Sequence, residues 1–363
     1  MTLRKLVLVA GLGGFVWSAC EKSAQAPTQP TEKGGAAGKT EAAASPLAKL
    51  PLGLDEFGTK IPENNPVTPA KVELGKHLYF DPRLSKDGTI SCATCHDPAK
   101  GWADNEPTST GIGHQKGNKN SPTVINRLFS TDQFWDGRAK SLEEQALGPV
   151  ANPVEMGNTL EGMIANVNLV PGYKPFFKAA FGDEKVTQER IAMAIASFER
   201  TVLSGNSPFD RYEAGDETAM SESAVRGMQI FRDNQKGRCS ICHAGFNFTD
   251  EKYHNLGVGT TQPDWEKTHA GRFDVTKQDK DKGAFKTPTL RQLTATAPYM
   301  HDGSEATLEA TVEFYVKGGN PNPHLDPEMK PLTLTDQEKK DLVEFMKALT
   351  GEVTKVEKPA LVK

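Results

Sequence analysis

Two CxxCH motifs constrain the fold of this chain more than any other feature of its sequence. They read CATCH from Cys92 to His96 and CSICH from Cys239 to His243. In each motif two thiols are spaced to form thioether bonds to one haem, and the histidine that follows can bind the iron as its proximal ligand. The motifs therefore predict two covalently bound haem c groups, and two structural zinc or disulfide loops are the competing interpretation. The predicted haem residues are Cys92, Cys95, His96, Cys239, Cys242 and His243.

The fifth cysteine, Cys20, ends an N-terminal segment that resembles an export signal. A short positive region precedes an apolar run at residues 6–17, which is too short for a typical membrane span. Small residues before Cys20 resemble a bacterial lipobox, in which Cys20 would be lipidated and become the mature N-terminus. Cleavage after residues 24–26 is the alternative. Either route predicts delivery to the periplasm, with residues 1–20 as the signal peptide.

The rest of the chain is divided by composition and length. Residues 21–50 are expected to form a disordered tether, because their first part is rich in small and polar residues and has no large apolar side chain. We expect two domains beyond it, at residues 51–205 and 206–363. The net charge of −4 and the lack of a basic block argue against nucleic-acid binding. Membrane contact is expected only through the lipid anchor.

A second sequence pattern follows each CxxCH motif, and its two copies keep a constant offset of 166 residues. The first copy covers residues 121–143 and the second covers residues 287–309, without a gap. Such a match indicates duplication of one haem domain. The same offset pairs Pro149 in the first half with Tyr315 in the second.

Apolar periodicity predicts a mainly α fold, with helices wrapped around the two haems. Residues 187–203 carry apolar side chains at helical spacing. Ser141 and Thr335 each open a capping-box sequence, which places Gln145 in the first turns of a helix. Strand patterns are weak, and residues 204–208 are expected to link the two halves.

The chain resembles the bacterial dihaem cytochrome c peroxidases and their relative MauG over about residues 60–350. The resemblance rests on residues 84–87, 134–138, 145, 152–156 and 297–303. It implies that the N-terminal haem reacts with hydrogen peroxide and that the C-terminal haem relays electrons. Family members are often dimers, so a homodimer is one expectation.

The resemblance also implies roles for individual residues. His96 becomes the proximal ligand of the peroxidatic haem and His243 that of the electron-transfer haem. Trp135 matches the tryptophan that bridges the two haems. Gln145 and Glu155 match the distal-pocket pair, in which the amide holds peroxide and the carboxylate moves a proton between its oxygens. The plain alternatives are a helix-surface amide for Gln145 and an exposed loop charge for Glu155.

A calcium ion between the two halves is implied in the same way. Asn120 matches the side-chain ligand, and Thr296 and Pro298 match the backbone-carbonyl ligands. Oxygen ligands of this kind suit calcium. An ordinary turn residue is the alternative for Asn120.

Two positions depart from the standard peroxidase. Ile112 stands where a histidine blocks the peroxidatic haem, and His114 nearby is the alternative blocking ligand. Tyr315 stands where the second haem of the standard peroxidase has a methionine ligand. MauG-like proteins also have tyrosine in this place. Met300 is the competing ligand, and a core aromatic is the plain alternative for Tyr315. The enzyme would then need no reductive activation and would react through a bis-ferryl state, with charge shared through Trp135.

Three functions are compatible with these residues. The leading one is reduction of hydrogen peroxide to water, with electrons from a small periplasmic donor such as a cytochrome c or a cupredoxin. The second is MauG-like oxidation of residues in a partner protein. The third is a non-enzymatic dihaem electron carrier. Gln145, Glu155 and an open iron argue against it, because a carrier keeps six ligands on both irons.

Overall fold

The computed structural model describes residues 45–363, and these belong to one compact unit. The predicted signal peptide, Cys20 and most of the predicted tether lie outside the described residues. No helix within the described part of the chain is long and apolar enough to cross a membrane.

The end of the predicted tether is packed against the body of the protein. Leu47 and Leu50 contact a small apolar cluster formed by Leu128, Phe129 and Leu203. The packed body therefore begins before residue 51.

The described chain is mainly helical, which confirms the predicted fold class. Its α-helices are α1 (Pro69–Tyr79), α2 (Cys92–Cys95), α3 (Leu142–Ala151), α4 (Leu160–Asn168), α5 (Tyr173–Phe181), α6 (Gln188–Glu199), α7 (Pro208–Glu213), α8 (Glu222–Arg232), α9 (Trp265–Thr268), α10 (Phe273–Thr276), α11 (Leu308–Val316) and α12 (Asp336–Ala348). The 3-10 helices are η1 (Glu56–Gly58), η2 (Pro82–Leu84), η3 (Pro98–Lys100), η4 (Ile112–His114), η5 (Arg127–Phe129), η6 (Cys239–Ile241), η7 (Asp279–Asp281) and η8 (Leu293–Ala295). The strands are β1 (Ser204–Gly205) paired with β4 (Glu352–Val353), and β2 (Tyr253–His254) paired with β3 (Phe285–Lys286), both antiparallel.

The helix boundaries follow the capping residues. Thr335 closes a capping box on α12, because its hydroxyl accepts from the Glu338 N–H while the Glu338 carboxylate accepts from the Thr335 N–H. At α3 the expected box forms only in part. The Ser141 hydroxyl accepts from the Glu144 N–H, but the Glu144 carboxylate accepts from the N–H of Lys140 instead, at 2.7 Å. The helix predicted over residues 187–203 forms as α6, which ends earlier, at Glu199.

Each half is built on a pair of helices that cross at a glycine. In the first half α1 packs on α6, and a Cβ atom at Gly75 would lie 1.9 Å from the carbonyl oxygen of Ala194. In the second half α8 packs on α12, and a Cβ atom at Gly227 would lie 1.9 Å from the carbonyl oxygen of Asp341. Because neither place has room for a side chain, glycine sets both crossings.

The local geometry repeats at the offset found in the sequence. Helices α3 and α11 begin 166 positions apart, after the N-caps Ser141 and Thr307. The isolated bridge between Gln133 and Ala139 recurs between Tyr299 and Glu305, again 166 positions later. The sequence repeat therefore corresponds to a repeat of backbone structure.

The two halves meet at a seam with reciprocal hydrogen bonds. The N–H of Asn120 donates to the carbonyl oxygen of His301 at 2.9 Å, and the N–H of Lys286 donates to that of Trp135 at 2.8 Å. Asn120 and Lys286 are repeat mates, as are Trp135 and His301. The halves therefore contact one another through equivalent surfaces, related by a local pseudo-two-fold axis.

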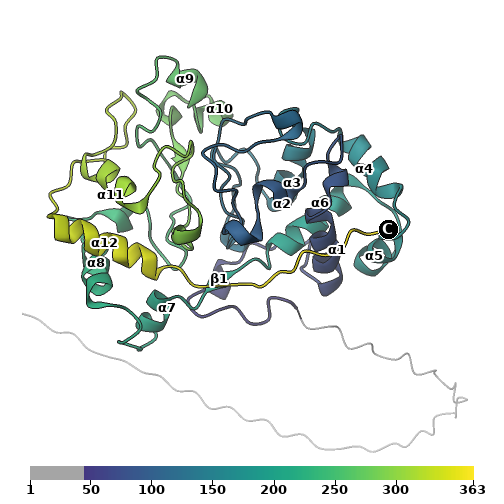
Figure 1. Cartoon of the computed structure of the whole chain (residues 1–363), viewed down its shortest axis with the longest axis horizontal. Coiled ribbons are helices and arrows are strands. Elements are labelled where there is room, and N and C mark those ends of the chain that lie inside the picture. The colour runs from purple at the N-terminus through teal and green to yellow at the C-terminus, as the bar shows by residue number, and fades with distance from the viewer. Residues whose placement is uncertain (1–44) are drawn as a thin grey trace, which may run out of the picture. The chain divides into compact units, whose positions relative to one another are not determined.

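The C-terminal tail crosses from the second half back to the first. After α12 it pairs β4 with β1 and then runs to the end of the chain beside α5 (Figure 1). The carbonyl oxygen of Val362 accepts from the Arg83 guanidinium at 3.0 Å, and that of Lys363 accepts from the Gly172 N–H at 2.9 Å. Residues 352–363, expected in the C-terminal domain, therefore pack on the N-terminal half. The first two residues of the linker expected at 204–208 form the strand β1.

Candidate active site

A single cavity of about 910 Å³ is lined by both CxxCH motifs. It lies in the part of the chain where the two halves meet, and it collects all of the residues singled out from the sequence as haem, catalytic or calcium residues. The predicted residues that line it are Cys92, Cys95, His96, Asn120, Trp135, Gln145, Glu155, Cys239, Cys242, His243, Thr296, Pro298 and Tyr315.

The first motif is held by its own short helix. Cys92 and Cys95 lie one turn apart on α2, and the N–H of His96 closes the helix by donating to the carbonyl oxygen of Cys92 at 3.0 Å. The hydroxyl of the fully buried Tyr79 donates to the carbonyl oxygen of His96 at 2.9 Å. Burial lowers the pKa of His96. Its Nδ1 is buried and has no hydrogen-bond partner among residues 45–363.

The second motif has its histidine oriented by the backbone. His243 Nδ1 lies 3.0 Å from the carbonyl oxygen of Phe248. An Nδ1–H that donates to this carbonyl leaves the Nε2 lone pair for a metal, the usual arrangement of a histidine ligand. Burial lowers the pKa of His243, which keeps the ring neutral.

These two constellations fit covalently attached haem. The thiols of Cys92, Cys95, Cys239 and Cys242 are free and line the same cavity as the two histidines. The histidine of each motif is half-buried and its pKa is lowered, which favours the neutral ring that an iron ligand needs.

The distal-pocket pair is positioned by α3 and by the loop that follows it. Gln145 lies in the second turn of α3, and Asn152 ends the helix. The Asn152 amide donates to Glu155 Oε1 at 2.7 Å. Burial raises the pKa of the Glu155 carboxyl above its usual range, partly opposed by Arg138 and by this hydrogen bond. A raised pKa brings the carboxyl closer to the working range of a proton shuttle.

The loop around Ile112 supports Glu155 and does not carry a histidine into the cavity. The Ile112 N–H donates to the Glu155 carbonyl oxygen at 2.8 Å. A Cβ atom at Gly111 would lie 2.0 Å from the Val154 carbonyl oxygen, so the two loops are in close contact. His114 is exposed and is not one of the described residues that line the cavity.

Trp135 lies at the seam between the two motifs. Its indole N–H donates to the Asn120 carbonyl oxygen at 2.9 Å. Its ring meets the His301 ring edge-on at 6.5 Å between centroids, and His301 stacks on Phe285 at 3.5 Å. The His301 Nε2 lies 2.8 Å from Nδ1 of His269. This packed group of rings gives Trp135 a fixed position between the halves.

Both candidate ligands of the second haem line the cavity. Tyr315 lies on α11 at the position that corresponds to Pro149 on α3, and Met300 lies on the preceding loop. Burial raises the pKa of the Tyr315 hydroxyl, and the thiols of Cys239 and Cys242 add to that effect. Ionisation of Tyr315 would therefore need the positive charge of a bound metal. The choice between Tyr315 and Met300 stays a prediction.

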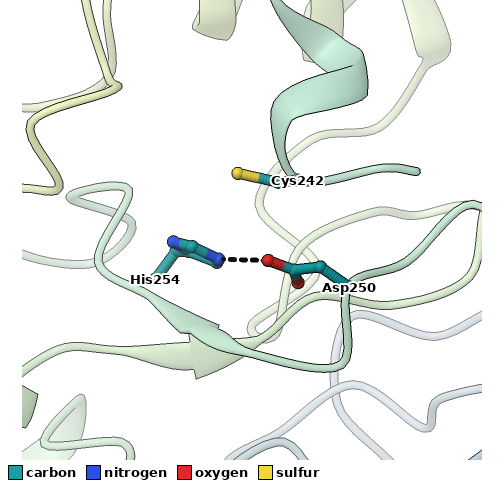
Figure 2. Close-up of side chains that lie close together, drawn as sticks. All are labelled: Cys242, Asp250 and His254. Atoms are coloured by element: carbon teal, nitrogen blue, oxygen red, sulfur yellow. Dashed lines mark hydrogen bonds and ion pairs between the residues drawn. The ribbon is translucent and has the colours of Figure 1, made fainter. Parts of the chain in front are cut away.

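A charged histidine beside the second motif was missed from the sequence. His254 Nδ1 lies 2.6 Å from Asp326 Oδ2. Its Nε2 lies 3.1 Å from Asp250 Oδ2 (Figure 2). Hydrogen bonds to Asp326 and Asp250 raise the pKa of His254 above its usual range, which favours the imidazolium. The grouping of Cys242, Asp250 and His254 could suggest a metal site, but the CxxCH motif requires the Cys242 thiol for haem attachment. No local motif marks His254, because Asp326 is distant in sequence.

Two buried ionisable side chains in the cavity were also missed. Glu199 and Lys286 are each only 5% exposed, and both line the cavity. Burial raises the pKa of Glu199 to about 8 and lowers that of Lys286 to about 8. The repeat could have identified Lys286 as the mate of Asn120, whereas nothing in the sequence marks Glu199.

Comparison with known proteins gives concordant matches. The sequence signature of the family described as "Di-haem cytochrome c peroxidase" matches residues 69–218. A methylamine utilization protein MauG from Methylorubrum extorquens is 41% identical over 83% of this chain and 84% of its own length. A cytochrome c551 peroxidase from Nitrosomonas europaea is 40% identical over 82% of this chain and 88% of its own length.

Solved structures are similar over most of the chain. The crystal structure of a MauG-like protein associated with microbial copper homeostasis aligns with a TM-score of 0.75 and 31% identity, covering 82% of this chain and 95% of that one. The diheme peroxidase BthA from Burkholderia thailandensis aligns with a TM-score of 0.66 and 21% identity, over 85% of this chain and 89% of that one. The second match supports the fold alone.

Proposed function

Because the chain belongs to the di-haem cytochrome c peroxidase and MauG family, we propose that it reduces hydrogen peroxide to water with electrons from a small redox donor. Membership makes the chain an oxidoreductase with two haem c groups, which argues further against the non-enzymatic electron carrier. The observation that carries the proposal is one cavity in which Gln145 and Glu155 accompany His96, with Trp135 lying toward the second motif.

The first half supplies the groups that peroxide chemistry requires. Haem held by Cys92, Cys95 and His96 would supply the iron that gives electrons to hydrogen peroxide. Gln145 then holds peroxide by hydrogen bonds from its amide. Glu155 accepts a proton from the oxygen nearer the haem and returns it to the departing oxygen. The pKa of its carboxyl, raised by burial, suits that exchange.

We further propose that the enzyme works without prior reduction. Ile112 replaces the blocking histidine of standard members, and His114 is exposed, so the distal side of the first haem is left to Gln145 and Glu155. Tyr315, half-buried on the wall of the shared cavity, is proposed as the axial ligand there. An anionic phenolate favours oxidised iron, which would let the second haem share the oxidising equivalents through Trp135.

Mixing the all-ferric protein with a small excess of peroxide tests this proposal. We expect a rapid change in the haem absorption spectrum before any reductant is added. A spectrum that changes only after reduction would contradict the proposal and favour the standard activation cycle.

Electron paramagnetic resonance of the ferric protein tests the ligands. One high-spin and one low-spin haem are expected, and Tyr315→Phe should change only the low-spin signal. Tyr212→Phe is a matched control, because Tyr212 packs beside the second core and does not line the cavity. Two low-spin haems in the wild type would restore His114, or another group, as a blocking ligand.

MauG-like oxidation of a partner protein is the second candidate. It is favoured by a MauG relative that is as similar as the peroxidase relatives and by Tyr315. Steady turnover of peroxide with reduced cytochrome c or a cupredoxin would favour the peroxidase. Consumption of peroxide that stops without a protein substrate would favour the second candidate.

We also propose a calcium ion held by Asn120, Thr296 and Pro298. The support for it is the family resemblance and the fact that all three residues line the cavity.

We propose a periplasmic location with a lipid anchor at Cys20. Labelling with a radioactive fatty acid in wild type and Cys20→Ser tests the anchor. Incorporation that is equal in both would contradict it.

A further inference from the structure

The pseudo-two-fold seam gives Asn120 an equivalent position in the second half, and that position holds Lys286. The two residues make the same backbone contact, since each donates its N–H across the seam to the carbonyl oxygen of a ring residue. For Lys286 that residue is Trp135, at 2.8 Å. The seam therefore carries an amide on one side of the axis and an ammonium group on the other.

The ammonium group of Lys286 is inside the protein. Its side chain is 5% exposed, lines the cavity shared by both motifs, and lies 3.5 Å from Glu251 Oε2. That oxygen has no hydrogen-bond partner in the described chain, while Glu251 Oε1 accepts from the Ser130 hydroxyl at 2.7 Å. Lys286 is thus the cation that offsets the Glu251 charge beside the first half.

We propose that Lys286 is a positioning residue that sets the charge around Trp135, and thereby controls how readily the seam and the two haems hold oxidising equivalents. The inference rests on the proposed function, because it assigns Lys286 to the electron path between the haems. Removal of an electron from the indole leaves positive charge on Trp135. The Lys286 backbone contacts Trp135 and its buried side chain lines the same cavity as the indole, so its ammonium charge opposes that charge through an interior that screens weakly.

The charge on Lys286 is adjustable near neutral pH. Burial and Arg127 lower its pKa, Glu251 and Asp132 oppose them, and the net pKa is about 8. Tyr253, its partner in the β2–β3 pair, is a neutral neighbour, because burial and Asp132 raise its pKa. As pH rises through about 8, Lys286 loses its proton and the seam loses one positive charge.

Redox titration of the holoprotein tests the inference, with Lys286→Met and Lys286→Arg compared over pH 6.5 to 9.5. At pH 7 the equilibrium constant for reducing each haem should fall about tenfold in Lys286→Met, because a buried positive charge is lost. In wild type the same fall should appear only as pH rises through about 8. Over the whole pH range, Lys286→Arg should keep the reduction constants that wild type has at low pH, since arginine stays charged.

Lys277→Met is the matched control for loss of one lysine charge. Lys277 is 67% exposed, so its removal should leave the reduction constants unchanged. Wild-type and Lys286→Met curves that run parallel at all pH values would overturn the inference. If Lys286→Met does not fold, Glu251→Gln serves instead. Loss of the Glu251 charge should move the wild-type transition to lower pH, and an unmoved transition would overturn the inference.

A second measurement separates this inference from the proposed function. The oxidised state formed by peroxide should persist longer in Lys286→Met than in wild type, because positive charge on Trp135 is then less opposed. Equal lifetimes in two proteins that both react with peroxide would overturn the inference alone. Wild-type protein that fails to react would overturn the proposed function, and the redox titration would still decide the role of Lys286.

Discussion

Glu155 illustrates how burial changes the chemistry of a single residue. Its carboxyl group is fixed by the Asn152 amide and by the backbone contact with Ile112, and burial raises its pKa. A carboxylate at an exposed loop would have neither property. The function proposed for Glu155 therefore depends on the loop that packs against it as much as on the side chain.

Replacement of Glu155 by glutamine removes the proton-accepting group while keeping its size. We expect the rate of reaction with peroxide to fall about 100-fold, within the range that general acid–base groups contribute. Stopped-flow absorbance at the haem bands measures it. Glu161→Gln is the control, because Glu161 is exposed in the first turn of α4 and should have no effect. An equal rate in Glu155→Gln and wild type would remove Glu155 from the mechanism.

Glu199 should make stability depend on pH. Its folded-state pKa of about 8 is above the usual 4.5, because burial penalises the carboxylate. The folded state therefore binds the proton more tightly, and the stability this contributes is complete below about pH 4.5 and is lost as pH rises through about 8.

Glutamine at position 199 removes this dependence. In thermal unfolding of the holoprotein, the melting temperature of Glu199→Gln should exceed that of wild type by several degrees at pH 9. The two melting temperatures should differ little at pH 5. A difference that is the same at both pH values would show that the effect is not ionisation of Glu199.

At the scale of elements, the two crossing helix pairs organise the halves. In both pairs a glycine lets the backbone of one helix approach the carbonyl of the other, at Gly75 and at Gly227. Such close approach fixes the crossing point, while the apolar faces of α1, α6, α8 and α12 supply the two cores. Apolar periodicity locates these faces, but it does not indicate where two helices touch.

Alanine at Gly75 should separate α1 from α6. The added Cβ would lie 1.9 Å from the Ala194 carbonyl oxygen, and that backbone cannot yield without moving the helix. We expect a loss of about 3 kcal/mol in the free energy of unfolding, at the upper end for overpacking. Gly117→Ala is the control, since its nearest neighbour would be 3.5 Å away. Denaturant unfolding measures both, and similar losses would contradict the argument.

The C-terminal tail is an element whose place the sequence misassigned. Val353, Val356 and Val362 pack against the core of the first half, although they follow the last helix of the second. Short apolar residues in a polar tail give no periodic signal, because each contacts the body singly. The tail therefore ties the two halves together in addition to the seam.

At the scale of the whole molecule, the seam brings the two haem motifs to one cavity. Its reciprocal hydrogen bonds join Asn120 to His301 and Lys286 to Trp135. Equivalent contacts of this kind are expected when two copies of one domain face each other. They make the proposed electron path through Trp135 and the proposed calcium position parts of the same interface.

Removal of calcium should loosen this interface. A chelator is expected to lower the melting temperature of wild type but not of Asn120→Ala, because the variant lacks the proposed side-chain ligand. Asn105→Ala is the matched control. Its amide donates across the seam to the carbonyl oxygens of Ala295 and Ala297, both at 2.9 Å, so the variant should be less stable yet still respond to the chelator. An unchanged response in Asn120→Ala would contradict the proposed site.

Much of the site could be predicted from the sequence because its chemistry is local. The thiols and histidine of each CxxCH motif are adjacent in the chain, so haem attachment needs no knowledge of the fold. Helix caps such as Thr335 and the repeat at 166 residues are also properties of neighbouring or aligned residues. The family resemblance then supplied Trp135, Gln145 and Glu155, which line one cavity with the motifs.

The tertiary structure alone decided which distant groups meet. The contact between His254 and Asp326, the burial of Glu199, and the pair formed by Lys286 and Glu251 all join segments that the sequence does not relate. Burial and electrostatic interaction depend on distance in space, and a one-dimensional pattern does not contain that distance. The sequence by itself therefore determined the two haems and their mainly helical setting, while packing across the seam decided the charges that surround them.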